Sequence, residues 1–367
     1  MNETILHKIA ELGQSVWLDT INRELLMEGG LADWVSRGIR GVTTNPAIFE
    51  QAIAATTDYD GDVRSLAQEG QSTANIYETL TLREVRAAAD ILRTVYDRTG
   101  RRDGYVSLEV NPMLASDPKS TVSEAKRLFK ALERPNVMIK IPATSEGVEA
   151  IEECIACGVN VNATLIFSGA QYAAVAEAFL KGLEKLAQKG EPLTPASVAS
   201  VFVSRIDAVV DALLAKSPGE DEQALKGHIA VDNTRLIYQK YKTVFNPENP
   251  RWKKLADAGA RSQRPLWAST GTKNPAYSDV LYVETLVGPD TVNTIPPKTL
   301  AALMEHGKAL CLLEDDLTGA TTRLQRLHAL NIDLDAVCLK LLQDGVAAFN
   351  ASFDTLMKSI EAKAKKQ

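Results

Sequence analysis

Short runs of β-branched and other apolar residues recur along the chain, and each is followed by a stretch with apolar residues about every 3.6 positions. The runs predict buried strands, and the stretches between them predict amphipathic helices that end at glycines. Eight strands are expected, at residues 15–20, 41–46, 105–110, 137–143, 161–167, 200–206, 265–270 and 291–296. Eight alternations of strand and helix predict an α/β fold, the (β/α)8 or TIM barrel.

Three segments are longer than such a barrel needs. Residues 47–104 and 207–264 predict extra helices after the second and sixth strands, and residues 298–367 predict several helices outside the barrel or across one end. Heptad-like apolar spacing in the last segment favours a covering helix over a coiled-coil partner. Because no repeat or low-complexity linker interrupts the chain, we expect a single domain, 1–367, whose barrel strands span about 15–296.

Lys140 occupies the middle of "VMIKIPA", where a buried strand would ordinarily carry valine or isoleucine. Because strand side chains alternate between two faces, placing Lys140 inside the barrel turns the aliphatic residues of this strand towards the helices. The same alternation puts Leu165 on the outer face of the fifth strand. It puts the following polar residues on the inner face: Asp19, Thr43, Asn45, Ser107, Glu109, Asn162, Thr164 and Ser269.

Most of these residues stand at or near the carboxyl ends of their strands, where barrel enzymes build their active sites. Burial disfavours the charged form of Lys140, and a neutral amine attacks a carbonyl carbon. The resulting Schiff base withdraws electrons and allows a neighbouring C–C bond to break. We therefore expect Lys140 to be a Schiff-base nucleophile. The alternative is a lysine whose tip reaches the surface.

Schiff-base chemistry also needs proton carriers. Glu109 and Thr164, on the strands either side of Lys140, could hold a water near the amine, and Asp19 could take the proton of the substrate hydroxyl at the bond that breaks. Asn45 and Asn162 could bind substrate hydroxyls without titrating. Asp19 and Asn45 could instead simply cap the helices that follow them.

Two basic residues suggest an anion at the same mouth. Arg205 follows the sixth strand, and Ser269 precedes "TGTK", whose Gly271 lets main-chain N–H groups approach a phosphate. Arg205 could alternatively pair with Asp207. Lys273 could be an ordinary exposed loop residue.

Composition narrows the function classes. The net charge is −6 with no long basic block, so we expect neither nucleic acid nor a membrane surface as partner. The amino terminus lacks a signal-peptide pattern, no apolar run approaches a membrane span of about 20 residues, and four cysteines fit a cytoplasmic location. "CIAC" at 154–157 is interpreted as core cysteines on a helix. The histidines are scattered among helical segments, so we expect no metal and no cofactor.

The strand motifs taken together resemble the transaldolase family, in its longer bacterial branch. The similar segments are "VWLDT", "GVTTNPAIF", "VSLEVNPML", "VMIKIPATSEG", "VNATLIFS", "SVFVSRID" and "WASTGTKNPAYSD". The resemblance implies a cofactor-free transfer of a dihydroxyacetone unit. The donor would be fructose 6-phosphate or sedoheptulose 7-phosphate, and the acceptor erythrose 4-phosphate or glyceraldehyde 3-phosphate. These sugar phosphates are the expected partners, with a homo-oligomer possible.

The resemblance also implies roles for single residues. Lys140 would form the Schiff base, Asp19 would act as acid and base at the cleaved bond, and Glu109 with Thr164 would hold water. The substrate would be bound by Thr43, Asn45, Asn162, Ser200, Arg205 and Ser269. Many relatives carry an aromatic residue and an arginine directly after the last serine. Here Thr270 and Gly271 stand instead, and Lys273 is the expected substitute cation.

Two other functions stay open at this level. A fructose 6-phosphate aldolase would share the lysine but release free dihydroxyacetone; relatives with that activity lack a carboxylate at the place of Glu109. A phosphosugar-binding barrel that senses without reacting would not need a buried amine.

Overall fold

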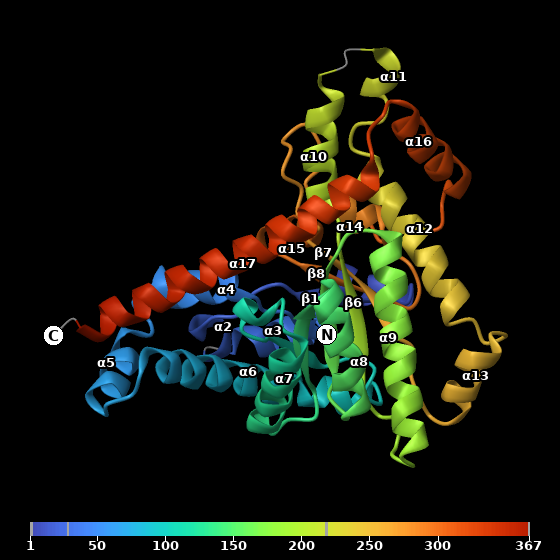
Figure 1. The fold of residues 1–367 in the computed structure, drawn as a ribbon. Coiled ribbons are helices and arrows are strands. Elements are labelled where there is room, and N and C mark those ends of the chain that lie inside the picture. The colour runs from blue at the N-terminus through green and yellow to red at the C-terminus, as the bar shows by residue number, and fades with distance from the viewer. Residues whose placement is uncertain (1–2, 28, 217–218, 366–367) are drawn as a thin grey trace.

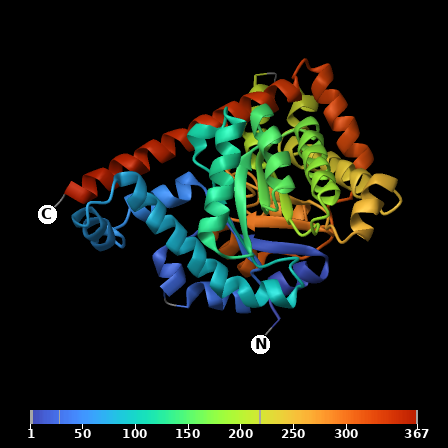
Figure 2. The same cartoon turned by 60° about the horizontal axis from the view of Figure 1, so that its bottom comes forward.

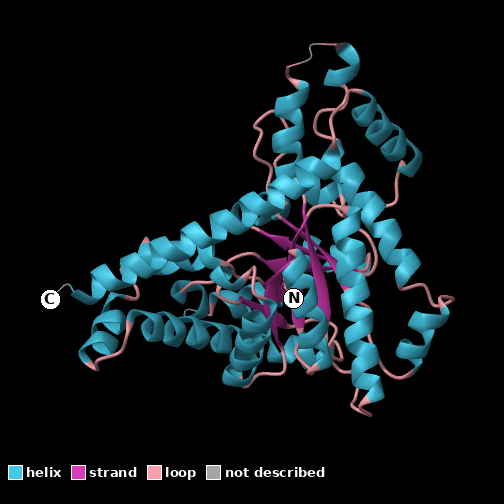
Figure 3. Cartoon of the chain, in the orientation of Figure 1, coloured by secondary structure: helices cyan, strands magenta, loops and turns pink. Residues whose placement is uncertain are grey.

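The computed structural model describes residues 3–27, 29–216 and 219–365. Its centre is a closed barrel of parallel strands in chain order, with the last strand paired to the first. The strands lie inside a shell of helices (Figure 3). They are β1 (Gln14–Leu18), β2 (Gly41–Val42), β3 (Tyr105–Glu109), β4 (Val137–Pro142), β5 (Val161–Ile166), β6 (Ser197–Phe202), β7 (Arg264–Ala268) and β8 (Thr291–Ile295). The predicted (β/α)8 fold is confirmed.

The observed strands differ from the predicted ranges by one or two residues at their ends, except for two strands that differ by three or more. β2 ends at Val42 instead of residue 46, because Asn45 and Pro46 begin a helix there. β6 starts at Ser197 instead of residue 200 and ends at Phe202, so Arg205 lies in the first turn of a helix. The small residues of "SVAS" at the start of β6 had hidden its extent from the apolar pattern.

The helices surround the barrel and extend beyond it (Figure 1). In chain order the helices and helical turns are α1 (Ile5–Glu11), α2 (Arg23–Met27), α3 (Gly30–Ser36), α4 (Pro46–Phe49), η1 (Glu50–Ala54), α5 (Asp60–Gln68), α6 (Thr73–Arg98), η2 (Pro112–Leu114), α7 (Pro118–Leu132), α8 (Ser145–Ala156), α9 (Gly169–Gln188), α10 (Ser204–Leu214), α11 (Glu220–Gln223), α12 (Ile229–Val244), α13 (Pro250–Asp257), α14 (Leu281–Thr285), α15 (Pro297–His306), α16 (Leu317–Ala329) and α17 (Leu334–Lys365).

The segments predicted to hold extra helices do so. Between β2 and β3 lie α4 and η1, then α5 and the 26-residue α6, which packs against β3. Between β6 and β7 lie α10 to α13, with α12 packed against α16. In Figure 1, α10 and α11 project from the barrel next to α16.

The 32-residue helix α17 covers the mouth of the barrel. It contacts α4, η1, α5 and α6 along one half, and η2, β5 and α10 elsewhere. Figures 1 and 2 show it as one long diagonal element that runs from α10 towards α5. These partners follow the carboxyl ends of the strands. The predicted covering helix is therefore confirmed, and it lies across the end of the barrel that holds Lys140.

The side-chain alternation predicted for β5 fails at one position. Ala163 pairs with Ala199 and Ile166 with Val201, so β5 carries one extra residue between these pairs. Leu165 takes up the bulge with a left-handed φ of 58°. Its side chain lies against Gly345 of α17, where an added Cβ would come within 2.9 Å of it. The prediction that Leu165 faces the outer helices is wrong.

One continuous hydrophobic cluster joins the barrel to the helices, α17 included. The prediction for "CIAC" is half correct: Cys154 is buried on α8, whereas Cys157 follows the end of that helix and is exposed. None of the helices in the described ranges is both long and apolar enough to cross a membrane.

Candidate active site

Lys140 lies at the centre of the strand ends. On β4 it is in register with Glu109 on β3 and with Asn162 on β5. The residue is only 4% exposed, although it carries an amine. Its Nζ donates a 3.2 Å hydrogen bond to the main-chain carbonyl of Thr44. The alternative of a lysine that reaches the outer surface does not fit this placement.

Glu109 is the nearest carboxylate to this amine. One oxygen lies 3.9 Å from Nζ of Lys140, and the residue is 6% exposed. Burial raises the pKa of Glu109 to about 7, and the charge of Lys140 opposes that rise. Neither carboxylate oxygen has a hydrogen-bond partner among the residues that the structure describes. A carboxyl group that titrates near neutrality can both give and accept a proton.

Thr164, on the strand on the other side of Lys140, also has a buried side-chain oxygen without a hydrogen-bond partner among the described residues. Its main-chain carbonyl accepts a 2.7 Å hydrogen bond from Ala143, which fixes the ends of β4 and β5 together. Its hydroxyl is buried, and no group in the described part of the chain hydrogen-bonds to it. The hydroxyl and the Glu109 oxygens therefore stay available for a solvent molecule or a substrate.

A second carboxylate follows β1. Asp19 accepts a 2.7 Å hydrogen bond from the hydroxyl of Thr43, whose oxygen also bonds the hydroxyl of Thr294 on β8. Burial raises the pKa of Asp19, while the charge of Lys140 and the Thr43 hydroxyl lower it. Asp19 does not cap a helix, so that alternative is excluded. The contact with Thr43 fixes its carboxylate within reach of the charge of Lys140.

A fully buried hydrogen-bonded layer supports the site beside Lys140. The amide of Asn162 donates to Ser107 Oγ at 3.0 Å and accepts from Ser200 Oγ at 2.6 Å. All three residues are inaccessible to solvent. In this arrangement Asn162 joins β3, β5 and β6 across the barrel interior.

These strand ends open into a cavity of about 340 Å³. Its walls come from the ends of β1, β2, β4 and β6 to β8, the following loops and α17. The lining residues are Asp19, Thr43, Asn45, Lys140, Ser200, Phe202, Arg205, Ala268, Ser269, Gly271, Thr272, Lys273, Thr294, Pro296, Lys298, Thr299 and Phe349. Five residues of the predicted inner face line this cavity: Asp19, Thr43, Asn45, Lys140 and Ser269. Ser107, Glu109, Asn162 and Thr164 are not among its lining residues, and Glu109 lines a separate cavity of about 180 Å³.

Asn45 serves two purposes at its wall. Its side-chain oxygen accepts a 2.9 Å hydrogen bond from the N–H of Ile48, and so caps α4. The alternative that Asn45 caps the helix that follows it is therefore confirmed for its side-chain oxygen. Because the cap uses only that oxygen, the NH2 group can still donate to a molecule in the cavity.

The far end of the cavity is basic. Arg205 stacks its guanidinium 5.3 Å from the ring of Phe202, and burial lowers the pKa of Arg205. No carboxylate among the described residues lies within ion-pair distance of it. Asp207 instead accepts hydrogen bonds from the N–H of Ala230 and the hydroxyl of Tyr282. The alternative of an Arg205–Asp207 ion pair is therefore excluded.

Lys273 is exposed and lies near Arg205. Both line the same cavity, and partial burial and then the positive charge of Arg205 lower the pKa of Lys273. Ser269 connects the same two segments: its Oγ is 3.1 Å from that of Ser204, and its carbonyl accepts from the N–H of Ser204. Two cations without an ion-pair partner among the described residues favour a bound anion at this end.

The sequence interpretation missed Phe349 and Lys298. The ring centroid of Phe349, on α17, lies 5.9 Å from Nζ of Lys140. Lys298, near the start of α15, lines the basic end. Apolar spacing predicted α17, but it carries no signal about which end of the barrel the helix covers. A lysine just after the predicted eighth strand was a signal that could have been used.

Comparison with known proteins agrees with the geometry. The family model described as "Transaldolase/Fructose-6-phosphate aldolase" matches residues 16–360, from β1 to the last turns of α17. The chain belongs to this family. The match includes the helix that brings Phe349 to the cavity, so the covering helix is part of the family's own pattern.

Curated relatives extend over the whole chain. "Transaldolase 2" of Nostoc punctiforme is 46% identical over 100% of this chain and 99% of its own length. "Transaldolase" of Trichodesmium erythraeum is 43% identical over 98% of both chains, and "Transaldolase 1" of Streptomyces avermitilis is 46% identical over 97% of this chain and 94% of its own.

Proposed function

We propose that the protein is a transaldolase. It moves a dihydroxyacetone unit between sugar phosphates through a Schiff base on Lys140, the transfer used in the non-oxidative part of the pentose phosphate pathway. The observation that carries this proposal is a buried amine, Lys140, that lines one cavity together with Asp19, Arg205 and Lys273 and has the carboxylate of Glu109 3.9 Å away. The family and its full-length relatives support the same reaction.

The phosphate of the donor ketose binds at the basic end. Arg205 and Lys273 supply its charge partners, with Ser269 beside them. Binding there extends the sugar towards Lys140, so the carbonyl carbon meets Nζ. The hydroxyl groups of the sugar lie among Asn45, Thr43 and Ser200.

Schiff-base formation then uses Glu109. Nζ of Lys140 attacks the carbonyl carbon, and the carbinolamine loses its hydroxyl as water. Glu109, with a pKa of about 7, donates the proton that this water needs and can take it back when the Schiff base is hydrolysed. Thr164 provides a hydroxyl for the water on the other side of the amine.

Cleavage uses Asp19. Its carboxylate removes the proton from the hydroxyl on the far carbon of the bond that breaks, and that carbon becomes the aldehyde of the product. The electrons of that C–C bond move into the iminium, an aldose phosphate leaves, and an enamine stays on Lys140. When an acceptor aldose phosphate enters, the enamine carbon attacks its aldehyde and Asp19 returns the proton.

A fructose 6-phosphate aldolase is the second candidate, since the family description includes that activity. An aldolase hydrolyses the enamine product and releases dihydroxyacetone, whereas a transaldolase keeps it until an acceptor arrives. The carboxylate of Glu109 beside Lys140 favours transfer, because relatives that act as aldolases lack it.

Product analysis separates these two functions. The enzyme is incubated with fructose 6-phosphate, with and without erythrose 4-phosphate, and both dihydroxyacetone and sedoheptulose 7-phosphate are measured. A transaldolase gives sedoheptulose 7-phosphate with the acceptor and little dihydroxyacetone without it. Release of dihydroxyacetone at the same rate without acceptor would identify an aldolase.

A further inference from the structure

A second charged cavity lies at the opposite end of the barrel from Lys140. Its volume is about 380 Å³, close to that of the active-site cavity. Residues at or next to the amino ends of strands form it, among them Tyr105 of β3, Met138 of β4 and Ser197 of β6. The loop 99–104 before β3 and the loop 261–263 before β7 complete its rim.

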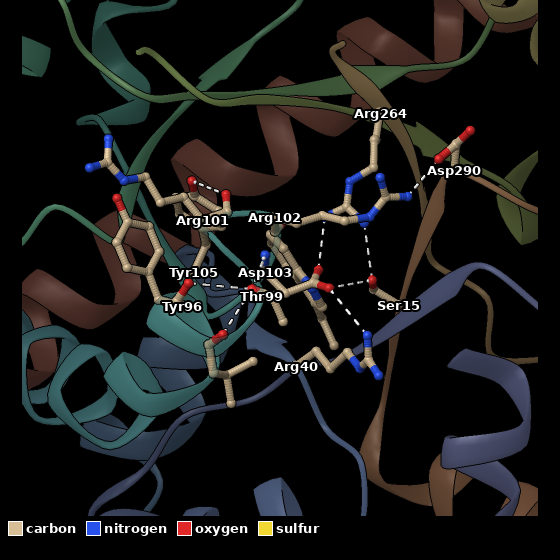
Figure 4. A network of polar contacts seen from close by, with 12 residues as sticks. Ser15, Arg40, Tyr96, Thr99, Arg101, Arg102, Asp103, Tyr105, Arg264 and Asp290 are labelled. Atoms are coloured by element: carbon tan, nitrogen blue, oxygen red, sulfur yellow. Dashed lines mark hydrogen bonds and ion pairs between the residues drawn. The ribbon is translucent and has the colours of Figure 1, made fainter. Parts of the chain in front are cut away.

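Four arginines line this cavity: Arg101, Arg102, Arg261 and Arg264. Two of them have carboxylate partners. Arg102 contacts Asp290 at 2.6 Å, and Arg264 contacts the fully buried Asp103 at 2.8 Å. Figure 4 shows both arginines converging on this network, with Ser15 and Arg40 on the other side of Asp103.

Both oxygens of the Asp103 carboxylate accept hydrogen bonds from neighbouring side chains. It accepts from Ser15 at 2.8 Å and from Arg264, and Arg40 lies 3.6 Å away. Burial alone would raise the pKa of Asp103, but the charge and hydrogen bond of Arg264 outweigh it and the pKa is lowered. The network is therefore complete without the other two arginines, and its function is structural.

Arg101 and Arg261 are exposed, and neither has an ion-pair partner among the described residues. Both line the cavity, and the main-chain N–H of Arg101 donates a 2.7 Å hydrogen bond to the carbonyl of Tyr96. The positive charges of both arginines oppose the rise that burial causes in the pKa of Tyr96. The neighbouring Asp97 is occupied by Arg93 at 3.1 Å. Two unbalanced positive charges thus face one cavity in a chain whose net charge is −6.

We propose that this cavity is a second binding site for a small organic phosphate ester, distinct from the active site. The guanidinium groups of Arg101 and Arg261 bind the phosphate, since planar arginine forks match phosphate oxygens in pairs. Tyr105 and Met138 supply an apolar wall for the carbon part of the ligand. A cavity about the size of the active-site cavity accommodates a sugar phosphate or a nucleoside monophosphate.

The test uses the full-length protein with the active-site cations removed, Arg205→Gln with Lys273→Gln, so that phosphate binding at the first cavity is weakened. Calorimetry at low ionic strength then measures the binding of glucose 6-phosphate and, separately, of AMP. We expect one equivalent of at least one of these esters to bind. The tighter of the two shows whether the site selects a sugar phosphate or a nucleoside monophosphate.

Adding Arg101→Gln and Arg261→Gln is expected to raise Kd at least tenfold. A matched control, Lys253→Gln with Lys358→Gln, removes two exposed charges elsewhere and should change Kd less than twofold. The pair Arg101→Lys and Arg261→Lys keeps the charges but not the planar guanidinium groups. Its Kd should lie between that of the parent protein and that of the Gln pair. The proposal is overturned if neither ester binds, if the Gln pair leaves Kd unchanged, or if the control pair weakens binding equally.

Discussion

The ring of Phe349 on α17 lies 5.9 Å from Nζ of Lys140 on β4. The last long helix of the chain therefore supplies a wall of the site whose nucleophile lies in the fourth strand. Gly345, one helical turn earlier, allows this approach, because a Cβ there would come within 2.9 Å of Leu165 and 3.6 Å of the Arg205 guanidinium. The covering helix is part of the catalytic environment.

Replacing Phe349 with leucine tests this contribution. The change keeps an apolar residue over Lys140 but removes the aromatic face, whose interaction with the cationic iminium that forms on Lys140 is worth about 0.5–2 kcal/mol. We expect the rate of Schiff-base formation to fall roughly twofold to thirtyfold. Phe129→Leu, on α7 and among the lining residues of neither the Lys140 cavity nor the Glu109 cavity, is the control and should leave the rate nearly unchanged. Equal rates in all three proteins would exclude a role for the ring.

Glu109→Gln tests the proton carrier beside the amine. Because the pKa of Glu109 is about 7, its carboxyl holds a proton below that pH and loses it above. As an acid for carbinolamine dehydration it should help most at low pH. The ratio of wild-type to Glu109→Gln trapping rates is therefore expected to fall as the pH rises from 6 to 8, measured by borohydride quench. A pH-independent ratio would assign Glu109 a structural role.

Arg205→Gln and Lys273→Gln test the phosphate end. Loss of a charge-assisted hydrogen bond costs about 1.5–3 kcal/mol, so Arg205→Gln should lower kcat/KM for fructose 6-phosphate roughly 10- to 100-fold. Lys273 is exposed, and its replacement should cost less. Lys298→Gln serves as comparison for the second cation. Activity on unphosphorylated fructose should stay the same in each variant; a parallel loss would show damage to the site instead.

Tyr277→Phe tests how the Lys273 loop is held. The hydroxyl of Tyr277 donates a 2.6 Å hydrogen bond to Asp211 on α10, and its ring packs on Gly227, whose N–H also donates to Asp211. Removing the hydroxyl should loosen the loop and raise KM for the sugar phosphate a few-fold, with kcat unchanged. Tyr238→Phe removes a distant hydroxyl and serves as control. Equal KM values would assign no positioning role to Tyr277.

Most residues of the inner face of the barrel could be predicted from the sequence, because the alternation of side chains along a strand is a local pattern. Lys140, Glu109 and Thr164 could be placed relative to one another by counting residues in steps of two along each strand. The alternation failed at Leu165, where the bulge depends on packing against Gly345 of α17. No local pattern encodes such a contact between distant segments.

The rest of the site depends on long-range packing for the same reason. Phe349 belongs to α17, whose apolar stripe is visible in the sequence. The end of the barrel that α17 covers depends on its packing against several other helices, which the sequence pattern does not show. Asn45 could be predicted both as a cap and as a cavity residue, and the structure combines the two. The second basic cavity joins arginines from two loops far apart in the chain, so only the closed barrel brings them together.

Borohydride trapping tests directly whether the substrate forms a Schiff base with Lys140. The wild-type protein and Lys140→Arg are incubated with fructose 6-phosphate, reduced with borohydride and digested, and the peptides are weighed by mass spectrometry. We expect the mass of a reduced dihydroxyacetone or hexose phosphate adduct on the peptide that contains Lys140, and none in the variant, which keeps its fold but loses turnover. An unmodified Lys140 in an active wild-type enzyme, or an adduct on another lysine, would contradict this expectation.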